Sequence, residues 1–339
     1  MKTARKPPVK TAGNREPAGH KNPAILTIDM LNVHFDLSGG KLLAVRDLSF
    51  TLRQGRTMGL VGESGCGKSV TAHSVLRLIR SPGVIASGRV DFRGRDLLSL
   101  PEDEMTAVRG REIAMIFQEP MTSLNPVLTV GYQIAEPLRI HLGMSEAQAR
   151  DRAVDLLASV GIGDPARRCS AYPHELSGGM RQRVMIAMSL STSPSILIAD
   201  EPTTALDVTI QAQILDLLLN LQRERKMSLL LITHDLGVVA NIADDVAIMY
   251  AGEIVESGTV RQLFDSPLHP YTIGLFEAIP RIGKRVRRLA TIPGMVPVFS
   301  ERPAGCAFHP RCFKAADECL RAPIPLVPRK GHLVRCIRV

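Results

Sequence analysis

A run of eight residues has the types and spacing of a loop that binds phosphate. It matches the pattern G-x-x-x-x-G-K-[ST] and consists of Gly62, Glu63, Ser64, Gly65, Cys66, Gly67, Lys68 and Ser69. Its three glycines let the backbone curl so that N–H groups face an anion, and the helix that follows adds its dipole. Lys68 can reach the outer phosphates, and the Ser69 hydroxyl can hold Mg²⁺. The run therefore predicts a site for a nucleotide phosphate.

Two carboxylates, Asp200 and Glu201, end the apolar run 196–201. Beside a phosphate-binding loop, a strand-end aspartate is placed near the metal, and a second carboxylate is placed to activate a water. His234 directly follows another apolar run, 228–233. A lone histidine is usually structural, but the end of a strand is where α/β proteins place ligands. We therefore treat all three side chains as candidates for hydrolytic chemistry.

The elements that must position these residues alternate between strands and helices. Apolar runs predict strands, and longer periodic runs predict helices between them. We expect strands at 25–28, 32–35, 42–45, 48–52, 57–61, 88–92, 113–117, 196–201, 228–233, 246–250 and 253–256, and helices at 70–79, 180–191 and 209–225. Buried strands that alternate with helices predict an α/β fold with a largely parallel central sheet.

A helical block interrupts this alternation. Residues 128–162 have a helical pattern with a break at 143–145, where Ser145 and Gln148 have the spacing of a capping box. We expect an inserted helical subdomain at about 119–185. The loop residues Ser177, Gly178 and Gly179 precede the next helix and form a second candidate anion-binding helix start.

The chain has 339 residues and a net charge of +9, and its charge is concentrated at the two ends. Residues 1–23 carry six Lys or Arg and one Glu, and we expect a disordered basic tail there. Basic ends can contact nucleic acid or anionic lipid, but most are solvated tails. No apolar run is long enough to span a bilayer, and no signal peptide is visible, so we expect a protein on the cytosolic side.

The ordered set of motifs resembles the ABC transporter ATPases over residues 24–265. Residues 62–69 correspond to the P-loop, Gln118 to the Q-loop, 176–179 to the LSGGQ-type signature, Asp200 and Glu201 to Walker B, 205–207 to the D-loop, and His234 to the switch histidine. Met180 stands where many members have Gln. The resemblance implies a P-loop NTPase with a RecA-like core, an antiparallel β subdomain and an inserted helical subdomain.

The resemblance also implies a role for each residue. Phe35, which could otherwise be a core residue, would stack on adenine. The P-loop would bind the β- and γ-phosphates of ATP. Ser69, Gln118 and Asp200 would bind Mg²⁺, Glu201 would be the general base, and His234 would contact the γ-phosphate. Ser177, Gly178 and Gly179 would act in trans on ATP bound to a partner ATPase, so a dimer is expected. Cys66 is interpreted as a passive small residue.

The C-terminal extension, residues 266–339, contains four of the six cysteines: Cys306, Cys312, Cys319 and Cys336. In a cytosolic chain such a cluster favours metal binding over disulfides, but its spacing differs from ordinary zinc sites. The segments 121–126, 268–272 and 291–294, together with the cysteines, resemble the oligopeptide/dipeptide and related nickel importer ATPases. In that group four such cysteines are associated with a [4Fe–4S] cluster; zinc or free thiols are the alternatives.

The sequence therefore predicts the ATP-hydrolysing subunit of a peptide importer on the cytosolic face of the inner membrane. The resemblance implies two transmembrane permease subunits, a paralogous ATPase subunit or a second copy of this chain, and an external solute-binding protein. The segment 118–172 is expected to contact the permeases, first of all through 119–126. Nickel or another small solute is the alternative cargo. A soluble ABC ATPase acting on nucleic acid or the ribosome is the rival hypothesis, since the basic ends could bind nucleic acid.

Overall fold

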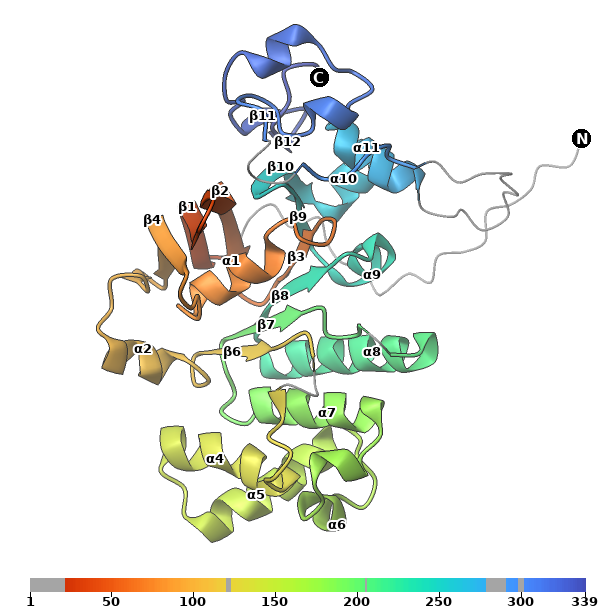
Figure 1. Cartoon of the computed structure of the whole chain (residues 1–339). Helices are drawn as coiled ribbons and strands as arrows, with labels where there is room; N and C mark the ends of the chain where they lie inside the picture. The colour runs from red at the N-terminus through yellow and green to blue at the C-terminus, as the bar shows by residue number, and fades with distance from the viewer. Residues whose placement is uncertain (1–21, 120–122, 205, 279–290, 298–301) are drawn as a thin grey trace, which may run out of the picture.

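The first strands of the chain form an antiparallel sheet. The computed structural model describes residues 22–119, 123–204, 206–278, 291–297 and 302–339, and most of the expected basic tail, 1–23, lies outside these ranges (Figure 1). The strands β1 (Ala24–Leu37), β2 (Gly40–Arg53), β4 (Gly83–Phe92) and β5 (Arg95–Asp96) form a sheet in the order β2-β1-β4-β5.

The prediction of two short strands in place of each of β1 and β2 was wrong. Each is one continuous strand of 14 residues. Met30 and Asp47 have positive φ angles of 49° and 42° where the register between the two strands shifts. These irregularities break the alternation of apolar and polar residues, which made one strand resemble two in the sequence.

The second sheet carries the chemistry. Its strand order is β11-β12-β10-β9-β3-β8-β7-β6. Five strands are parallel, as expected: β6 (Ile113–Ile116), β7 (Ile196–Asp200), β8 (Ser228–Thr233), β3 (Thr57–Val61) and β9 (Asp245–Tyr250). The strands β3, β7 and β8 are buried at every residue, which explains their continuous apolar runs.

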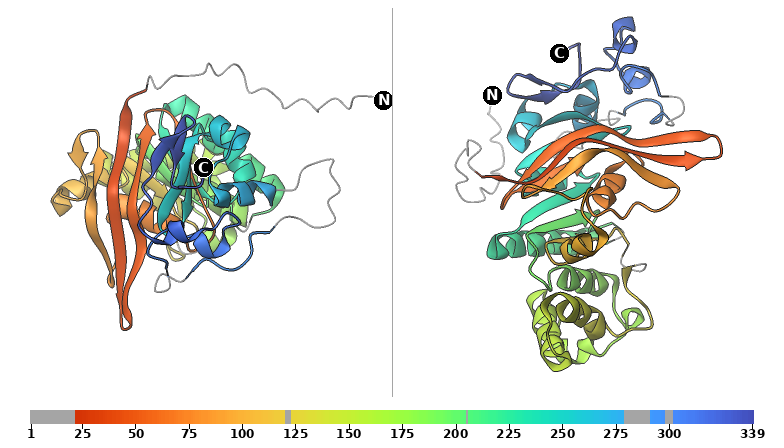
Figure 2. Two further views of the ribbon diagram at one scale, coloured as in Figure 1. Left: turned by 90° about the horizontal axis from the view of Figure 1, so that it is seen from above. Right: turned by 90° about the vertical axis from the view of Figure 1, so that its left-hand side faces the viewer.

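The helices α1 (Lys68–Val75), α8 (Val208–Arg225) and α9 (Leu236–Ile242) each follow a parallel strand, and α2 (Glu102–Val108) leads from the antiparallel sheet into β6. Figure 2 shows the antiparallel sheet beside the main sheet, with β1 and β2 extending beyond it. The helix α2 was not predicted, because it has only seven residues, five of them exposed. The two sheets share one core cluster, in which Leu26 and Val45 lie together with Leu60 and Ile198.

The helical block lies at the opposite end of the molecule from the C-terminal segments (Figure 1). It contains α4 (Val130–Leu142), α5 (Glu146–Ser159), α6 (Pro165–Cys169), the short helix η1 (Pro173–Glu175) and α7 (Gly178–Ser189). The capping box at α5 is confirmed: Gln148 N–H donates to Ser145 Oγ at 3.3 Å, and Ser145 N–H donates to Gln148 Oε1 at 3.0 Å. Leu157 and Ile186 share a core cluster with Leu197 of β7, which attaches the block to the main sheet.

The C-terminal segments complete the main sheet. They include β10 (Glu253–Thr259), α10 (Val260–Asp265), α11 (Pro270–Glu277), the short helices η3 (His309–Arg311) and η4 (Asp317–Leu320), β11 (Val327–Arg329) and β12 (His332–Val334). The strand β12 pairs antiparallel with β10, and His332 Nε2 lies 2.8 Å from Glu256 Oε1 in the interior. Within the described ranges, no helix is both long and apolar enough to cross a membrane.

Candidate functional site

The loop Gly62–Ser69 connects β3 to α1, as its motif requires. Gly65 and Gly67 have positive φ angles of 77° and 104°, which residues with a side chain rarely adopt. A Cβ atom on Gly62 would lie 2.2 Å from the carbonyl oxygen of Met249, so the chain packs too closely for any side chain there. The glycines are therefore required by the backbone path of the loop.

Lys68 begins α1 and is buried under the loop. Its Nζ donates to the carbonyl oxygens of Gly62 and Glu63 at 2.9 and 3.0 Å. The ammonium is thus held against the loop by its own backbone. Cys66 is also buried, and burial raises the pKa of its thiol, with Lys68 opposing this. A buried thiol with a raised pKa is a poor nucleophile, in keeping with a passive packing role.

Asp200, at the end of β7, has an unpaired carboxylate oxygen. The residue is only 2% exposed, and its Oδ1 has no hydrogen-bond partner among the described residues. Burial raises the pKa of Asp200, while a hydrogen bond to the Ser69 side chain lowers it. A buried carboxylate without a full set of partners is costly unless a cation neutralises it. Ser69 and Asp200 therefore fit a Mg²⁺ site beside the P-loop.

Glu201 is the point where three other side chains converge. Gln118 Nε2 donates to its Oε2 at 3.3 Å, and Thr204 Oγ1 donates to the same oxygen at 2.9 Å. His234 Nδ1 lies 3.3 Å from Glu201 Oε1. The sequence pointed to Gln118, Glu201 and His234 but missed Thr204, although it lies three residues after Glu201. These contacts fix the orientation of the Glu201 carboxylate, as is required of a base that activates a water.

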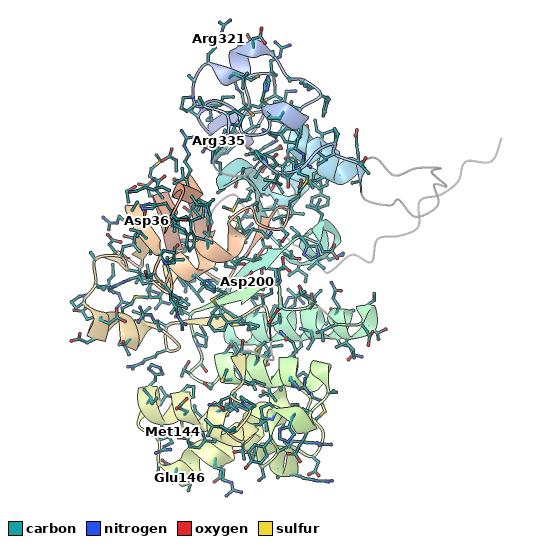
Figure 3. The ribbon with its side chains drawn as sticks, viewed as in Figure 1. Asp36, Met144, Glu146, Asp200, Arg321 and Arg335 are labelled. Carbon is teal, nitrogen blue, oxygen red and sulfur yellow. The ribbon has the colours of Figure 1, made fainter. Side chains whose placement is uncertain are left out.

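One cavity joins the P-loop to Gln118 and Glu201. It has a volume of about 300 Å³ and is lined by Phe35, Leu42, Ala44, Ser64, Gly65, Gly67, Lys68, Ser69, Val70, Gln118 and Glu201. Phe35 is half-buried on β1, so its ring can pack against its neighbours and also line the cavity. Figure 3 shows Asp200 in the middle of the molecule, between the antiparallel sheet and the helical block.

The signature residues do not line this cavity. Ser177 caps α7, with its Oγ accepting from Met180 N–H at 3.4 Å. Ser177 and Gly178 are exposed and Gly179 is half-buried, on the helical block. Of the D-loop residues, Ala205 lies outside the described ranges. The structure thus brings together the P-loop, Gln118, Asp200, Glu201 and His234, but leaves the signature residues apart from them.

The four C-terminal cysteines lie close enough to influence one another. Burial raises the pKa of Cys306 to about 11, against an opposing backbone hydrogen bond from Phe308, and Cys312, Cys336 and Cys319 raise it further. The Cys312 and Cys336 sulfurs also accept backbone N–H groups, from Lys314 and Arg338, each at 3.4 Å. All four cysteines are free thiols.

The expected metal site at these cysteines is not assembled in the structure. Among the described residues, no three His, Cys, Asp or Glu side chains come close enough together to hold a metal ion. Four cysteine sulfurs are the donor set of a thiolate-bound metal group. Backbone N–H groups that point at sulfur lower the thiol pKa, but burial outweighs them and raises the pKa of Cys306, Cys312 and Cys336. The pairing of each sulfur with the N–H group two residues later recurs at Cys306, Cys312 and Cys336.

Comparisons with known proteins match two parts of the chain. Residues 45–204 match the family described as ABC transporter, and residues 255–319 match the oligopeptide/dipeptide transporter C-terminal region. A peptide import ATP-binding protein of Brucella melitensis is 53% identical over 93% of this chain and 97% of its own. The dipeptide transport ATP-binding protein DppD of Escherichia coli K12 is 51% identical over 87% of this chain and 90% of its own.

Solved structures show the same fold. The ATP-binding cassette MJ0796, in a dimeric post-hydrolysis state bound to ADP and Pi, has a TM-score of 0.63 and 27% identity; the match covers 70% of this chain and 99% of that one. The protein cbiO1 of Clostridium perfringens, part of the ABC transporter complex cbiONQ, has a TM-score of 0.60 and 25% identity. That match covers 72% of this chain and 91% of cbiO1.

Proposed function

The chain belongs to the ABC transporter ATPases, and on that premise we propose that it is the ATP-hydrolysing subunit of an importer for di- or oligopeptides at the inner membrane. One observation carries the ATPase part: Gln118, Thr204 and His234 converge on Glu201 beside the unpaired oxygen of Asp200. The names of the peptide and dipeptide relatives, and the matching C-terminal region, support the cargo.

The chain's own residues supply the parts of phosphoryl transfer to water. Phe35 stacks on adenine, and the backbone of Gly65–Lys68 with the Lys68 ammonium holds the β- and γ-phosphates. Ser69, Asp200 and Gln118 bind Mg²⁺, which neutralises phosphate charge when it is bound. Glu201 takes a proton from the attacking water, and His234 and Gln118 orient the γ-phosphate and that carboxylate. The catalysis is positioning and charge stabilisation.

A second ATPase subunit completes the nucleotide site. Ser177, Gly178 and Gly179 do not line the cavity of their own chain, and Ser177 and Gly178 are exposed at the start of α7. An exposed helix start with backbone N–H groups suits a phosphate presented by another molecule. The partner is a paralogous ATPase or a second copy of this chain, and MJ0796 is dimeric.

The helical block provides the surface for two transmembrane permease subunits. Several large apolar side chains are exposed on or beside α4, namely Val127 at 75%, Ile140 at 68%, Tyr132 at 46% and Leu142 at 43%. They lie within the expected contact segment 118–172. Exposed apolar groups clustered on one element are typical of an interaction site. The first expected contact, 119–126, falls partly on residues 120–122, which lie outside the described ranges.

The subunit then works as a peripheral protein on the cytosolic face of the membrane, and an external solute-binding protein delivers the peptide. Nickel or another small solute remains the alternative cargo, because the ATPase subunit does not contact cargo. The rival hypothesis, a soluble ATPase that acts on nucleic acid or the ribosome, has less support, since the relatives are named for peptide transport.

At the extension, the proposed group is a [4Fe–4S] cluster held by Cys306, Cys312, Cys319 and Cys336, with zinc as the alternative. Four free thiols with N–H groups directed at three of the sulfurs support it. Bound there, the cluster would link segments that otherwise have little regular structure. We expect anaerobically purified protein to contain iron and acid-labile sulfide. The variant Cys336→Ser should lose both. Zinc without iron would favour the alternative, and neither metal would refute both.

The test of the proposed function is to purify tagged chain from gently solubilised membranes and identify its companions. Two multi-spanning apolar proteins and an ATPase are expected, with ATP hydrolysis in the purified assembly. Ribosomes or nucleic acid, without membrane proteins, would overturn the transport role.

A further inference from the structure

One P-loop residue is held from outside the nucleotide-binding core. Arg311 Nη1 lies 3.1 Å from both carboxylate oxygens of Glu63, although the two residues are 248 positions apart. The Arg311 side chain is 6% exposed and that of Glu63 is 28% exposed. In addition, the backbone N–H of Glu63 donates to Tyr271 Oη at 3.1 Å. The extension thus contacts both the side chain and the backbone of the same P-loop residue.

Arg311 is itself fixed in place. Its Nε donates to the carbonyl oxygen of Pro293 at 2.9 Å, and its Nη1 also lies 3.4 Å from Tyr250 Oη. The guanidinium carbon lies 5.7 Å from the centre of the Tyr250 ring and 6.0 Å from that of Phe308. A guanidinium held on several sides loses little further entropy when it pairs with a carboxylate. The contact to Glu63 is therefore preorganised.

Arg311 also connects the P-loop to two of the four cysteines, Cys306 and Cys312. It ends the short helix η3 and directly precedes Cys312. Its N–H donates to the Phe308 carbonyl oxygen at 3.0 Å, and Phe308 N–H bonds to Cys306. Glu63 lies in the part of the chain that matches the ABC transporter family, whereas Arg311 and Tyr271 lie in the part that matches the oligopeptide/dipeptide extension. The contact joins the two matched regions at the ATP site.

We propose that Arg311 is a positioning residue, which, together with Tyr271, holds the P-loop through Glu63 in the conformation that binds ATP. This inference rests on the proposed ATPase function. A phosphate-binding loop gains affinity when its backbone is fixed before the ligand arrives. Loss of the Arg311 contact should therefore weaken ATP binding more than it slows the chemical step, since Arg311 does not touch the reacting atoms.

The experiment is a double-mutant cycle on the full-length chain in its assembled complex. It compares the wild type, Arg311→Gln, Glu63→Gln and the double variant by the Kd for ATP, by KM and by kcat. Each single variant should raise Kd and KM about tenfold, within the range typical of coupled sites, with kcat changed about twofold at most. The double variant should be no weaker than either single variant, because both break one contact.

A matched control breaks another Arg–Glu pair of the same extension. Arg338 Nη1 lies 2.9 Å from Glu318 Oε1, and both side chains are about half-exposed. Arg338→Gln should leave Kd and KM unchanged. A thermal unfolding curve for every variant separates loss of folded protein from loss of affinity.

The possible outcomes separate this inference from the proposed function. If the wild type binds ATP and the folded Arg311→Gln variant binds it equally well, or if the two single effects simply add, the positioning role is wrong and the ATPase function stands. If the wild-type complex neither binds nor hydrolyses ATP, the proposed function itself fails.

Discussion

Glu201 and Asp200 are neighbours in the sequence with very different surroundings. The Glu201 carboxylate contacts Gln118, Thr204 and His234, whereas one buried oxygen of Asp200 has no hydrogen-bond partner in the part of the chain that the structure describes. This difference gives the two carboxylates different roles. Glu201 is already oriented toward the cavity by polar neighbours, and Asp200 needs a cation to complete its environment.

The role of Glu201 can be tested with Glu201→Gln, which keeps the shape of the side chain but cannot accept a proton. We expect ATP binding to remain and hydrolysis to fall by a factor of roughly 10² to 10⁴, the usual contribution of a general base. Binding of labelled ATP and phosphate release are measured on the same assembled complex. Unchanged turnover would rule out Glu201 as the base.

The role of Asp200 can be tested with Asp200→Asn. Because burial raises the pKa of Asp200, the amide should not destabilise the protein without ligand, so its Tm should stay equal or rise. The extra stabilisation by MgATP over ATP with EDTA should disappear, since a ligand stabilises the folded protein by an amount that grows with the logarithm of its concentration over its Kd. A variant that keeps the Mg²⁺-dependent increase in Tm would contradict the metal site.

At the residue scale, motif spacing placed the P-loop and the two carboxylates at strand ends, where the structure has them, while their roles stay predictions. The sequence did not predict Thr204, Tyr271 or Arg311. Arg311 reaches Glu63 only through the path of the extension, and no local pattern marks such a contact.

Among the elements, α11 begins at a buried histidine that should make stability depend on pH. His269 is 1% exposed, and its Nδ1 accepts from Tyr271 N–H at 3.1 Å. Burial lowers its pKa to about 3. The native state therefore leaves His269 neutral, whereas the unfolded chain binds a proton below about pH 6.5. Its contribution to stability is present above that pH and is lost as pH falls toward 3.

His269→Asn tests this account, because Asn keeps an acceptor at the helix start but does not titrate in this range. Between pH 7 and pH 5.5 the wild type should lose about 1 kcal/mol more unfolding free energy than the variant. Denaturant unfolding at the two pH values measures the difference. Equal losses in both proteins would mean that His269 is protonated in the native state.

The helix α4 allows a test of the permease surface. Ile140 is 68% exposed, so a charge there should not disturb the core. Ile140→Glu should leave ATP binding intact but reduce recovery of permease subunits with the chain, roughly tenfold if the side chain is a central anchor. Met30→Glu, at a residue that is 50% exposed on β1, is the control. Equal recovery with both variants would place the docking surface elsewhere.

The strands whose residues are all buried could be predicted from the sequence. The strands β3, β7 and β8 are continuous apolar runs, and the α5 capping box is a local signal. The strand β12 was missed because it has only three residues, and its pairing partner, β10, lies far away in the sequence. The prediction for β1 and β2 failed for a different reason, since the register shifts between them break the alternation of apolar and polar residues.

On the scale of the whole molecule, the ATP cavity and the signature residues belong to different parts of the chain, which explains the need for a partner. The extension, in contrast, is tied to the core. Its strand β12 joins the main sheet, and Arg311 contacts the P-loop. The sequence indicated an appended segment, whereas the structure shows one that completes the sheet and reaches the ATP site.

Peptide import can be tested directly by uptake of a labelled dipeptide or oligopeptide series by cells of the native host. Uptake is compared in the wild type, in a deletion of this chain, and in the deletion complemented with the wild-type chain or with Glu201→Gln. We expect deletion to abolish saturable uptake of at least one peptide, the wild-type chain to restore it, and Glu201→Gln not to restore it. Undiminished uptake of every peptide in the deletion strain, or full restoration by Glu201→Gln, would contradict an ATP-hydrolysing peptide importer subunit.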